Sequence, residues 1–402
     1  VRRADQFGVL VGEVTLDYAR AQARKRQVVG ALHRGIEYLM RKNRIAVFSG
    51  HGRILSPTRV GISLNDGSET EVETRHILIA TGSKPRALPG IPVDNVRVLD
   101  STGALELQEV PRSMVIVGAG AIGLEFCTLF RSFGADVTVV ELLPRVLPME
   151  DEEISEAMAR SLSRKGVKVH TSSKVEEVER VEGGVKVRIS TPEGDRVLSA
   201  DYVLVAVGRR PNTEGIGLEE LGVRMERGYV LVDEDMRTSR PDIFAIGDCV
   251  PTLALAHVAS AEGKYVADLV SGGRPRRLRH EAMPRAVYSE PELAAVGLTE
   301  AQAQERGLEV MVARFPLRNN GRAAIHGRLE GLVKVVAERR TGTVLGVHMA
   351  GYGAPELIAE GALAIQLQAT VREFGEAVRA HPTVSEAVME AAEAALGMAI
   401  HV

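Results

Sequence analysis

The feature that most constrains this chain is a glycine-rich loop set between an apolar strand and a helix. In the segment Met114-Val-Ile-Val-Gly118-Ala-Gly120-Ala-Ile-Gly123, an apolar run leads into a G-x-G-x-x-G pattern. Gly118 permits a tight turn, Gly120 lets the backbone approach a pyrophosphate, and Gly123 lets the helix pack closely on the strand. Glu141 ends the next predicted strand, at the spacing typical of an acid that binds a ribose hydroxyl. The pattern predicts a dinucleotide-binding unit.

Glu141 also indicates which nucleotide binds. A carboxylate accepts hydrogen bonds from the ribose 2′-hydroxyl of NAD, whereas it repels the 2′-phosphate of NADP. The alternative, a glycine turn kept only for packing, leaves an acid at this spacing without a role. We therefore expect NAD rather than NADP.

One pattern occurs twice along the chain. Residues Ile77 to Pro85 read ILIATGSKP and residues Val203 to Pro211 read VLVAVGRRP, and each is an apolar strand that ends in Gly-x-x-Pro after a polar hairpin. An internal duplication explains this similarity. A glycine loop at Gly118 precedes the second copy, but none precedes Gly82. We therefore expect the partner loop to lie upstream of Val1, and we interpret the chain as N-terminally truncated.

Composition places the chain among globular proteins with several domains. Its 402 residues exceed the usual size of one hydrophobic core, and 45% of them are apolar and 26% charged. No apolar run is long enough to span a bilayer, and a net charge of -3 argues against general binding to nucleic acid. The two cysteines, Cys127 and Cys249, allow no cysteine-rich metal site, and they fit a reducing, cytoplasmic location.

Alternating strand and helix patterns predict an α/β protein with two Rossmann-like units, the first incomplete, followed by an α+β domain. Residues 15–43 are rich in helix formers. We expect them to form an amphipathic helix capped by Thr15. Its apolar positions are Val28, Leu32, Ile36, Leu39 and Met40.

A candidate acid–base group lies near the C-terminus, in the segment His381-Pro-Thr-Val-Ser-Glu386. Pro382 interrupts helix formation, and Glu386 falls in the first turn of the next predicted helix. A histidine oriented by a carboxylate can exchange protons near neutral pH. The alternative is that Thr383-x-x-Glu386 is a capping box with no catalytic role. The other histidines lack metal-ligand spacing, so we expect no metal site.

Two further segments are compatible with ligand binding. Gly247-Asp248 follows a short predicted strand, where the aspartate either completes a turn or accepts hydrogen bonds from a polyol. Ala254-Leu-Ala-His257 enters a helix whose free amides would suit an electron-rich ring edge.

Taken together, these segments resemble the pyridine nucleotide-disulfide oxidoreductases, most closely those of the dihydrolipoamide dehydrogenase type. The resemblance covers essentially the whole chain. Its markers are Ala80-Thr-Gly82, the loop Gly118 to Gly123 continuing into Leu124-Glu125-Phe126, Val207-Gly-Arg-Arg-Pro211-Asn212, Gly247-Asp248, Leu255-Ala-His257, Pro291-Glu-Leu-Ala-Ala-Val-Gly297 and His381-Pro-Thr-Val-Ser-Glu386.

The resemblance implies a homodimer that uses FAD and NAD. Residues 1–112 would be the remainder of an FAD-binding domain and residues 113–235 the NAD-binding domain. Residues 236–280 would return to the FAD and central part, and residues 281–402 would form the interface domain. Electrons would pass from dihydrolipoamide, free or on a lipoyl-bearing protein, through a cysteine pair and FAD to NAD.

The resemblance also assigns roles to single residues. His381 would deprotonate the substrate thiol at the disulfide site of the other subunit, and Glu386 would orient it. The NAD site would comprise Gly118, Ala119, Gly120, Ala121, Ile122, Gly123, Leu124, Glu125, Glu141, Val175 and Gly208. FAD would contact Gly52, Ala80, Thr81, Gly82, Asp248, Ala254, Leu255, Ala256 and His257.

The chain departs from the family pattern in one respect. The family has a first glycine loop for FAD and a Cys-x4-Cys pair near its start, and neither occurs in these residues. The 402 residues alone are therefore expected to bind FAD poorly and not to reduce a disulfide. Alternatives are a mercuric reductase, a glutathione reductase, a soluble transhydrogenase or a non-catalytic NAD-binding dimer.

Overall fold

A five-stranded parallel sheet forms the centre of the nucleotide-binding unit in the computed structural model, which describes residues 3–401. The strands run in the order β6-β13-β7-β8-β9. Their bounds are Val98–Leu99 for β6, Tyr202–Val205 for β13, Ser113–Val117 for β7, Asp136–Val140 for β8 and Lys168–His170 for β9. Because β6 pairs with β13, this sheet begins upstream of the boundary expected at residue 113.

The two faces of this sheet are covered by different kinds of element. Helices α3 (Ala121–Phe133) and α4 (Glu152–Arg164) lie on one face, where Met114 and Ile116 of β7 are buried among their apolar side chains. Val115 and Val117 are buried on the opposite face, against an antiparallel meander. Successive side chains of a strand point to opposite faces, so β7 must be apolar at nearly every position.

The repeated sequence pattern corresponds to a repeated topology. A three-stranded antiparallel meander precedes each copy of the apolar strand. The first meander consists of β1 (Gly50–Ser56), β2 (Arg59–Leu64) and β3 (Glu69–Glu73), and β4 (Ile77–Ile79) follows it. The second consists of β10 (Lys174–Val181), β11 (Gly184–Thr191) and β12 (Gly194–Ala200), and β13 follows it. The ends of both copies, β5 (Ser83–Pro85) and β14 (Arg209–Pro211), pair with each other.

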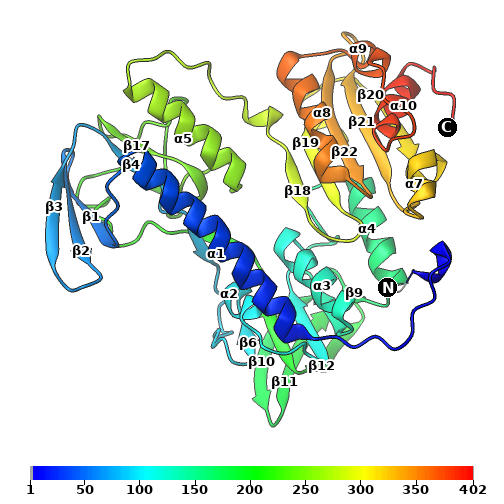
Figure 1. The fold of residues 1–402 in the computed structure, drawn as a ribbon, viewed down its shortest axis with the longest axis horizontal. Coiled ribbons are helices and arrows are strands. Elements are labelled where there is room, and N and C mark those ends of the chain that lie inside the picture. The colour runs from blue at the N-terminus through cyan, green and yellow to red at the C-terminus, as the bar shows by residue number, and fades with distance from the viewer. Residues whose placement is uncertain (1–2, 402) are drawn as a thin grey trace.

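The first unit is completed by chain that returns to it after the second. Strand β17 (Ile243–Ala245) pairs in parallel with β4, and helix α5 (Ala256–Val270) follows it. Figure 1 shows β1 to β4, β17 and α5 together as one lobe, apart from the nucleotide-binding sheet. This arrangement brings Ser83, at the end of the first copy, into hydrogen-bond contact with Asp248.

The C-terminal domain is a five-stranded antiparallel sheet covered by helices. Its order is β18-β19-β22-β21-β20, with bounds Arg285–Val287, Leu293–Gly297, Val344–Ala350, Leu332–Glu338 and Val310–Pro316. Its helices are α6 (Glu300–Glu305), α7 (Gly321–Ile325), α8 (Ala354–Leu367), α9 (Val371–Glu376) and α10 (Glu386–Ala395). Apolar side chains of β19, β21, β22, α8 and α10 form one core cluster.

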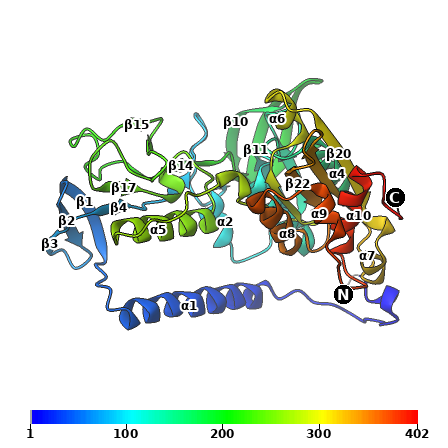
Figure 2. The same ribbon diagram turned by 90° about the horizontal axis from the view of Figure 1, so that it is seen from above.

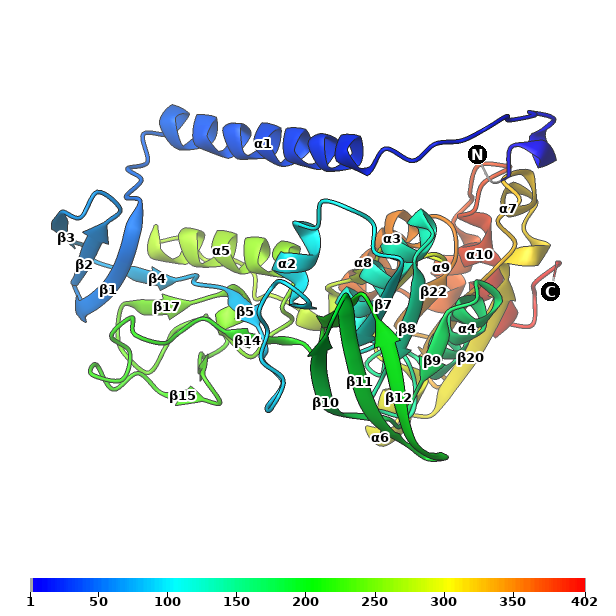
Figure 3. The same ribbon diagram turned by 90° about the horizontal axis from the view of Figure 1, so that it is seen from below.

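The long N-terminal helix, α1 (Tyr18–Lys42), differs from its prediction in two respects. Its cap is Asp17, which accepts a hydrogen bond from the Arg20 amide, and not Thr15. The predicted apolar face is largely exposed. The helix is anchored near its start, where Gln22 and Lys25 bond to oxygens at the end of α2 (Ser101–Leu105) and just after it. Figures 2 and 3 show α1 running along the outside of the molecule. No helix within residues 3–401 combines the length and apolar character needed to cross a membrane.

A buried lysine joins the nucleotide-binding unit to the C-terminal domain. The side chain of Lys334 on β21 is 2% exposed, and its Nζ lies 3.0 Å from Asp151, 2.7 Å from Glu153 and 2.8 Å from Glu300. Arg314 adds two hydrogen bonds of 2.6 Å to Glu153. Buried charges are tolerated only when they are paired and hydrogen-bonded, so this group fixes α4 against the sheet of the C-terminal domain.

Lys334→Met should destabilise this junction strongly, because the change leaves the buried Asp151 carboxylate without its cation. Removing one partner of a buried ion group costs about 3 kcal/mol. The check is the free energy of unfolding measured with urea. Lys186→Met, at an exposed position on β11, is the matched control and should change it little. Equal stability of the two variants would contradict the structural role of Lys334.

The same group makes stability depend on acid. Hydrogen bonds from Arg314, and then from Lys334, hold the pKa of Glu153 at about 2, below its usual 4.5. Because the pKa is lower in the folded state, the stabilising contribution is present above pH about 4.5 and is lost as the pH falls towards about 2. The Tm of Arg314→Gln should therefore fall less than the Tm of the wild type as the pH is lowered from about 4.5 to about 2.

Candidate nucleotide and acid–base sites

The glycine loop between β7 and α3 has the geometry that its sequence predicts. Gly118 has φ +104°, and a Cβ there would lie 2.5 Å from the carbonyl oxygen of Ala206. A Cβ at Gly123 would lie 2.0 Å from the Gly118 oxygen, so both glycines are required by close backbone packing. Gly120 differs, because a Cβ there would meet no atom within 4 Å. The space beside Gly120 is therefore open to a ligand, as a pyrophosphate site requires.

Helix α3 begins at this loop without a capping side chain. Gly120 occupies the cap position, and no side chain accepts hydrogen bonds from the first amides of the helix. Free amides and the positive end of a helix dipole attract phosphate. Of the expected contact positions, Ala121 is exposed and Ile122 partly exposed, which leaves the helix start accessible.

Glu141 lies directly beside the glycine loop, at the end of β8. Its Oε2 accepts a 2.6 Å hydrogen bond from the Ala119 amide, and its Oε1 accepts one of 2.8 Å from the Leu143 amide. The residue is 8% exposed. Two amides thus fix the orientation of the carboxylate while leaving acceptor capacity for a ribose diol. The residues present therefore fit NAD.

The other positions expected at this site differ in what their side chains contact. Leu124 is fully buried in the core, and the Glu125 carboxylate accepts a hydrogen bond from the Tyr288 amide in the C-terminal domain. Val175 is buried beneath the sheet, so only its backbone can face a nucleotide. Gly208 has φ +107° and open space beside it. The side chains of Leu124 and Glu125 thus serve packing and domain contact.

The expected flavin positions meet at the ends of β4 and β17. Asp248 accepts a 2.5 Å hydrogen bond from the Ser83 hydroxyl, which in turn accepts one of 2.6 Å from Arg209. Gly82 has φ +69° and no atom within 4 Å of a Cβ position. The Asp248 carboxylate, 25% exposed, retains acceptor sites for a polyol. Ala80 and Thr81 lead into Gly82 and belong to the same strand end.

Helix α5 supplies the next part of this region. Ala254 precedes the cap residue Leu255, and the helix begins at Ala256 without a capping side chain. The His257 ring bonds to the backbone oxygen of Pro284 at 2.7 Å. Gly52, by contrast, is exposed on the outer meander in β1. The residues thus fit one side of a flavin site, although no glycine loop for its pyrophosphate occurs in the 402 residues.

His381 and Glu386 form the predicted pair. Nδ1 of His381 lies 2.9 Å from Oε1 of Glu386, and the histidine side chain is 81% exposed. Oε2 of Glu386 accepts a 2.8 Å hydrogen bond from the Thr383 amide. Although burial opposes ionisation, the bonds from Thr383 and His381 lower the pKa of Glu386. The carboxylate is therefore held ionised, with the histidine oriented towards it.

Only one of the two hydrogen bonds of a capping box is present at Thr383 and Glu386. Glu386 reaches back to the Thr383 amide, but the Thr383 hydroxyl donates to the Ala380 oxygen, and Ser385 is the cap of α10. Glu386 therefore both orients His381 and supports the chain ahead of α10.

A second carboxylate, which the sequence did not reveal, holds this segment. Arg379, whose side chain is 8% exposed, bonds through Nε at 3.2 Å and Nη2 at 2.9 Å to one oxygen of Glu360 on α8. The Ser385 hydroxyl bonds to the other oxygen. Glu360 thus ties together the chain on both sides of His381. Nothing in the local sequence pairs Glu360 with Arg379, because they lie on different elements.

The two cysteines do not form a redox pair. Both are buried and free, Cys127 in α3 and Cys249 after β17. Burial raises the pKa of Cys127 to about 12 and also raises that of Cys249. Neither thiol is therefore a ready thiolate nucleophile.

Comparison with known families agrees with this geometry. The pyridine nucleotide-disulphide oxidoreductase family matches residues 6–263, and the dimerisation domain of the same oxidoreductases matches residues 283–392. Dihydrolipoyl dehydrogenase from Bacillus subtilis is 41% identical, with 100% of this chain and 86% of that protein covered. The enzyme of the same name from Geobacillus stearothermophilus is 40% identical, with 100% and 85% covered.

Solved structures give the same result. LpdA from Mycobacterium tuberculosis superimposes with a TM-score of 0.90 at 31% identity, over 98% of this chain and 86% of that one. The HOCl-induced flavoprotein disulfide reductase RclA from Escherichia coli superimposes with a TM-score of 0.85 at 28% identity, over 94% and 86%. The glycine loop, the duplicated topology and these similarities lead to one conclusion: the chain belongs to the pyridine nucleotide-disulphide oxidoreductases.

Proposed function

We propose that this protein is an NAD-dependent oxidoreductase of the dihydrolipoyl dehydrogenase type. The overall reaction converts dihydrolipoamide and NAD⁺ into lipoamide, NADH and a proton, so the dithiol loses two electrons and two protons. The observation that carries the proposal is the carboxylate of Glu141 beside an open glycine loop, in a chain about 40% identical to proteins named dihydrolipoyl dehydrogenase. FAD and NAD are the cofactors of this chemistry.

The second Rossmann-like unit, residues 113–235, is proposed to bind NAD. The open face of Gly120 and the uncapped start of α3 would receive the pyrophosphate, and Glu141 would bind the adenosine ribose. Ala119 and Leu143 hold that carboxylate in place before the nucleotide arrives. The site is therefore preorganised, which reduces the entropy lost on binding.

The flavin supplies a two-electron relay between a dithiol and the nicotinamide when it is bound. The residues that would hold its polyol side are Asp248 and Ser83, with Arg209 fixing the serine hydroxyl. The uncapped start of α5 at Ala256 would face the ring.

His381 is proposed to accept a proton from the substrate thiol. Glu386 occupies Nδ1, so Nε2 is the free nitrogen, and the high exposure of the side chain leaves it accessible. No hydrogen bond or ion pair within residues 3–401 connects His381 to the glycine loop or to Asp248. We therefore place its action at a site completed by the second subunit of a homodimer, whose dimerisation domain spans residues 283–392. A lipoyl-bearing protein is the proposed partner.

Replacing Glu141 should change nucleotide preference. Glu141→Gln removes the negative charge with little change in shape, and Glu141→Arg reverses it; each should weaken NAD binding and reduce discrimination against NADP by about tenfold. Calorimetric titration with NADH and NADPH measures both affinities. Glu226→Arg, on the exposed strand β15 (Met225–Glu226), is the control. Unchanged preference in both Glu141 variants would remove this residue from the site.

In a chain extended upstream of Val1 by a family-type segment that carries the first glycine loop and the Cys-x4-Cys pair, His381→Gln should lower lipoamide turnover by roughly 10²-fold or more, as loss of a general base does. The chain offers a matched control: His401 forms a similar pair with Glu390, with Nδ1 2.5 Å from Oε1. His401→Gln should therefore leave turnover nearly intact. Equal losses in the two variants would mean that His381 has only a structural role.

Glu360 should act as a positioning residue for His381. Glu360→Gln weakens the bond to Arg379, so in the same extended chain kcat for lipoamide should fall while NAD affinity is unchanged. Amide hydrogen exchange in residues 377–383 should also become faster. Glu356→Gln, one turn earlier on α8 and exposed, is the control. If exchange in residues 377–383 stays as slow as in the wild type, the proposed clamp is wrong.

A further inference from the structure

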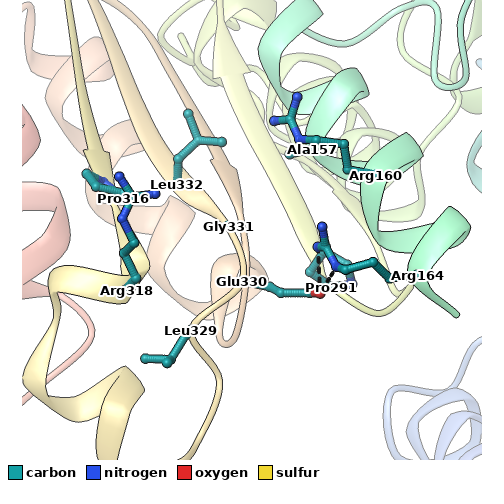
Figure 4. Close-up of a pocket in the computed structure, with 10 residues that line it drawn as sticks. All are labelled: Ala157, Arg160, Arg164, Pro291, Pro316, Arg318, Leu329, Glu330, Gly331 and Leu332. Carbon is teal, nitrogen blue, oxygen red and sulfur yellow. Dashed lines mark hydrogen bonds and ion pairs between the residues drawn. The ribbon is translucent and has the colours of Figure 1, made fainter.

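A cavity of about 320 Å³ lies between α4 of the nucleotide-binding unit and the C-terminal domain. None of its lining residues belongs to the glycine loop or to the His381 segment. Figure 4 shows Arg160 and Arg164 on α4 at one side of the cavity and Arg318, from the short helix Leu317–Asn319, at the other. The cavity is thus separate from the sites of the proposed reaction.

The lining of this cavity carries an excess of positive charge. Three arginines face one acid, Glu330, which leaves a formal charge of two. The neighbouring cavity of about 590 Å³ shares Glu330 with the smaller one, and its other charged residues are Arg3, Lys165, Arg328, Glu290 and Glu292.

The internal ion pairs leave two of the arginines available. Both oxygens of Glu330 already accept hydrogen bonds: one accepts two from Arg164, of 2.9 and 2.6 Å, and the other accepts one from Ser161. Arg160 has only an exposed 3.2 Å ion pair with Glu156 on its own helix, and pairs of this kind contribute little. Arg318 has no ion pair within residues 3–401. Arg160 and Arg318 can therefore bind an external anion.

The rest of the lining is apolar and defines the ligand further. Pro291, Pro316, Leu329 and Leu332 line the cavity between the charged groups. A guanidinium presents parallel N–H groups that match phosphate oxygens, and an apolar wall suits a carbon skeleton. The volume lies at the lower end of the range for small-molecule sites.

We propose that this cavity binds a small phosphorylated organic molecule, with its phosphate between Arg160 and Arg318 and its carbon body against the prolines and leucines. Because the cavity lies between two domains that the Lys334 group also joins, an occupant would contact both of them. The proposal does not depend on the reaction proposed above.

Calorimetric titration with phenyl phosphate tests this site, in the presence of saturating NAD⁺ so that the glycine loop is occupied. Phenyl phosphate should bind more tightly than inorganic phosphate, and phenol should give no heat. Arg318→Gln and Arg160→Gln should each weaken binding by about tenfold, as expected for loss of a charge-assisted hydrogen bond. Arg306→Gln, an exposed arginine outside the cavity, should leave it unchanged.

Three outcomes would overturn the proposal: no binding of phenyl phosphate by the wild type, equal affinity in both cavity variants and the wild type, or binding only when NAD⁺ is left out. The last outcome would place the phosphate at the glycine loop. The circular dichroism spectrum and the NAD affinity of each variant show whether its fold is intact. Because Arg160 and Arg318 are exposed, both quantities should match those of the wild type.

Discussion

The close approach of α3 to β7 is the constraint on which the nucleotide site depends. Gly118 and Gly123 allow contacts that any Cβ would block, and the helix start consequently lies directly above the strand ends. The same approach brings the Ala119 amide within 2.6 Å of the Glu141 carboxylate. The proposed phosphate site and the proposed ribose acceptor are therefore produced together by one turn of the backbone.

Much of this could be predicted from the sequence, because it depends on local patterns. The apolar run before Gly118, the position of Glu141 and the two copies of the strand ending in Gly-x-x-Pro all correspond to observed elements. The His381–Glu386 pair is also local, since the two residues lie five positions apart. Thr15 was wrong as a helix cap because Asp17 offers a carboxylate to the Arg20 amide.

The remaining features depend on pairing between distant residues. Nothing in the local sequence distinguishes Lys334 from an ordinary strand lysine, because its partner Asp151 lies at the start of α4. Glu360 and Arg379 likewise form their ion pair because α8 packs against the segment before α10. The sheet face covered by a meander rather than by helices also has no local signal. For α1, the periodicity of the apolar residues predicted the helix correctly, but it did not reveal what the helix contacts.

The central claim is that the glycine loop and Glu141 hold NAD. A crystal structure of the protein with NAD⁺ tests it most directly. We expect the pyrophosphate over Gly120 at the start of α3, and the adenosine ribose hydroxyls within hydrogen-bond distance of the Glu141 carboxylate. A nucleotide bound elsewhere, or with its ribose turned away from Glu141, would contradict the account.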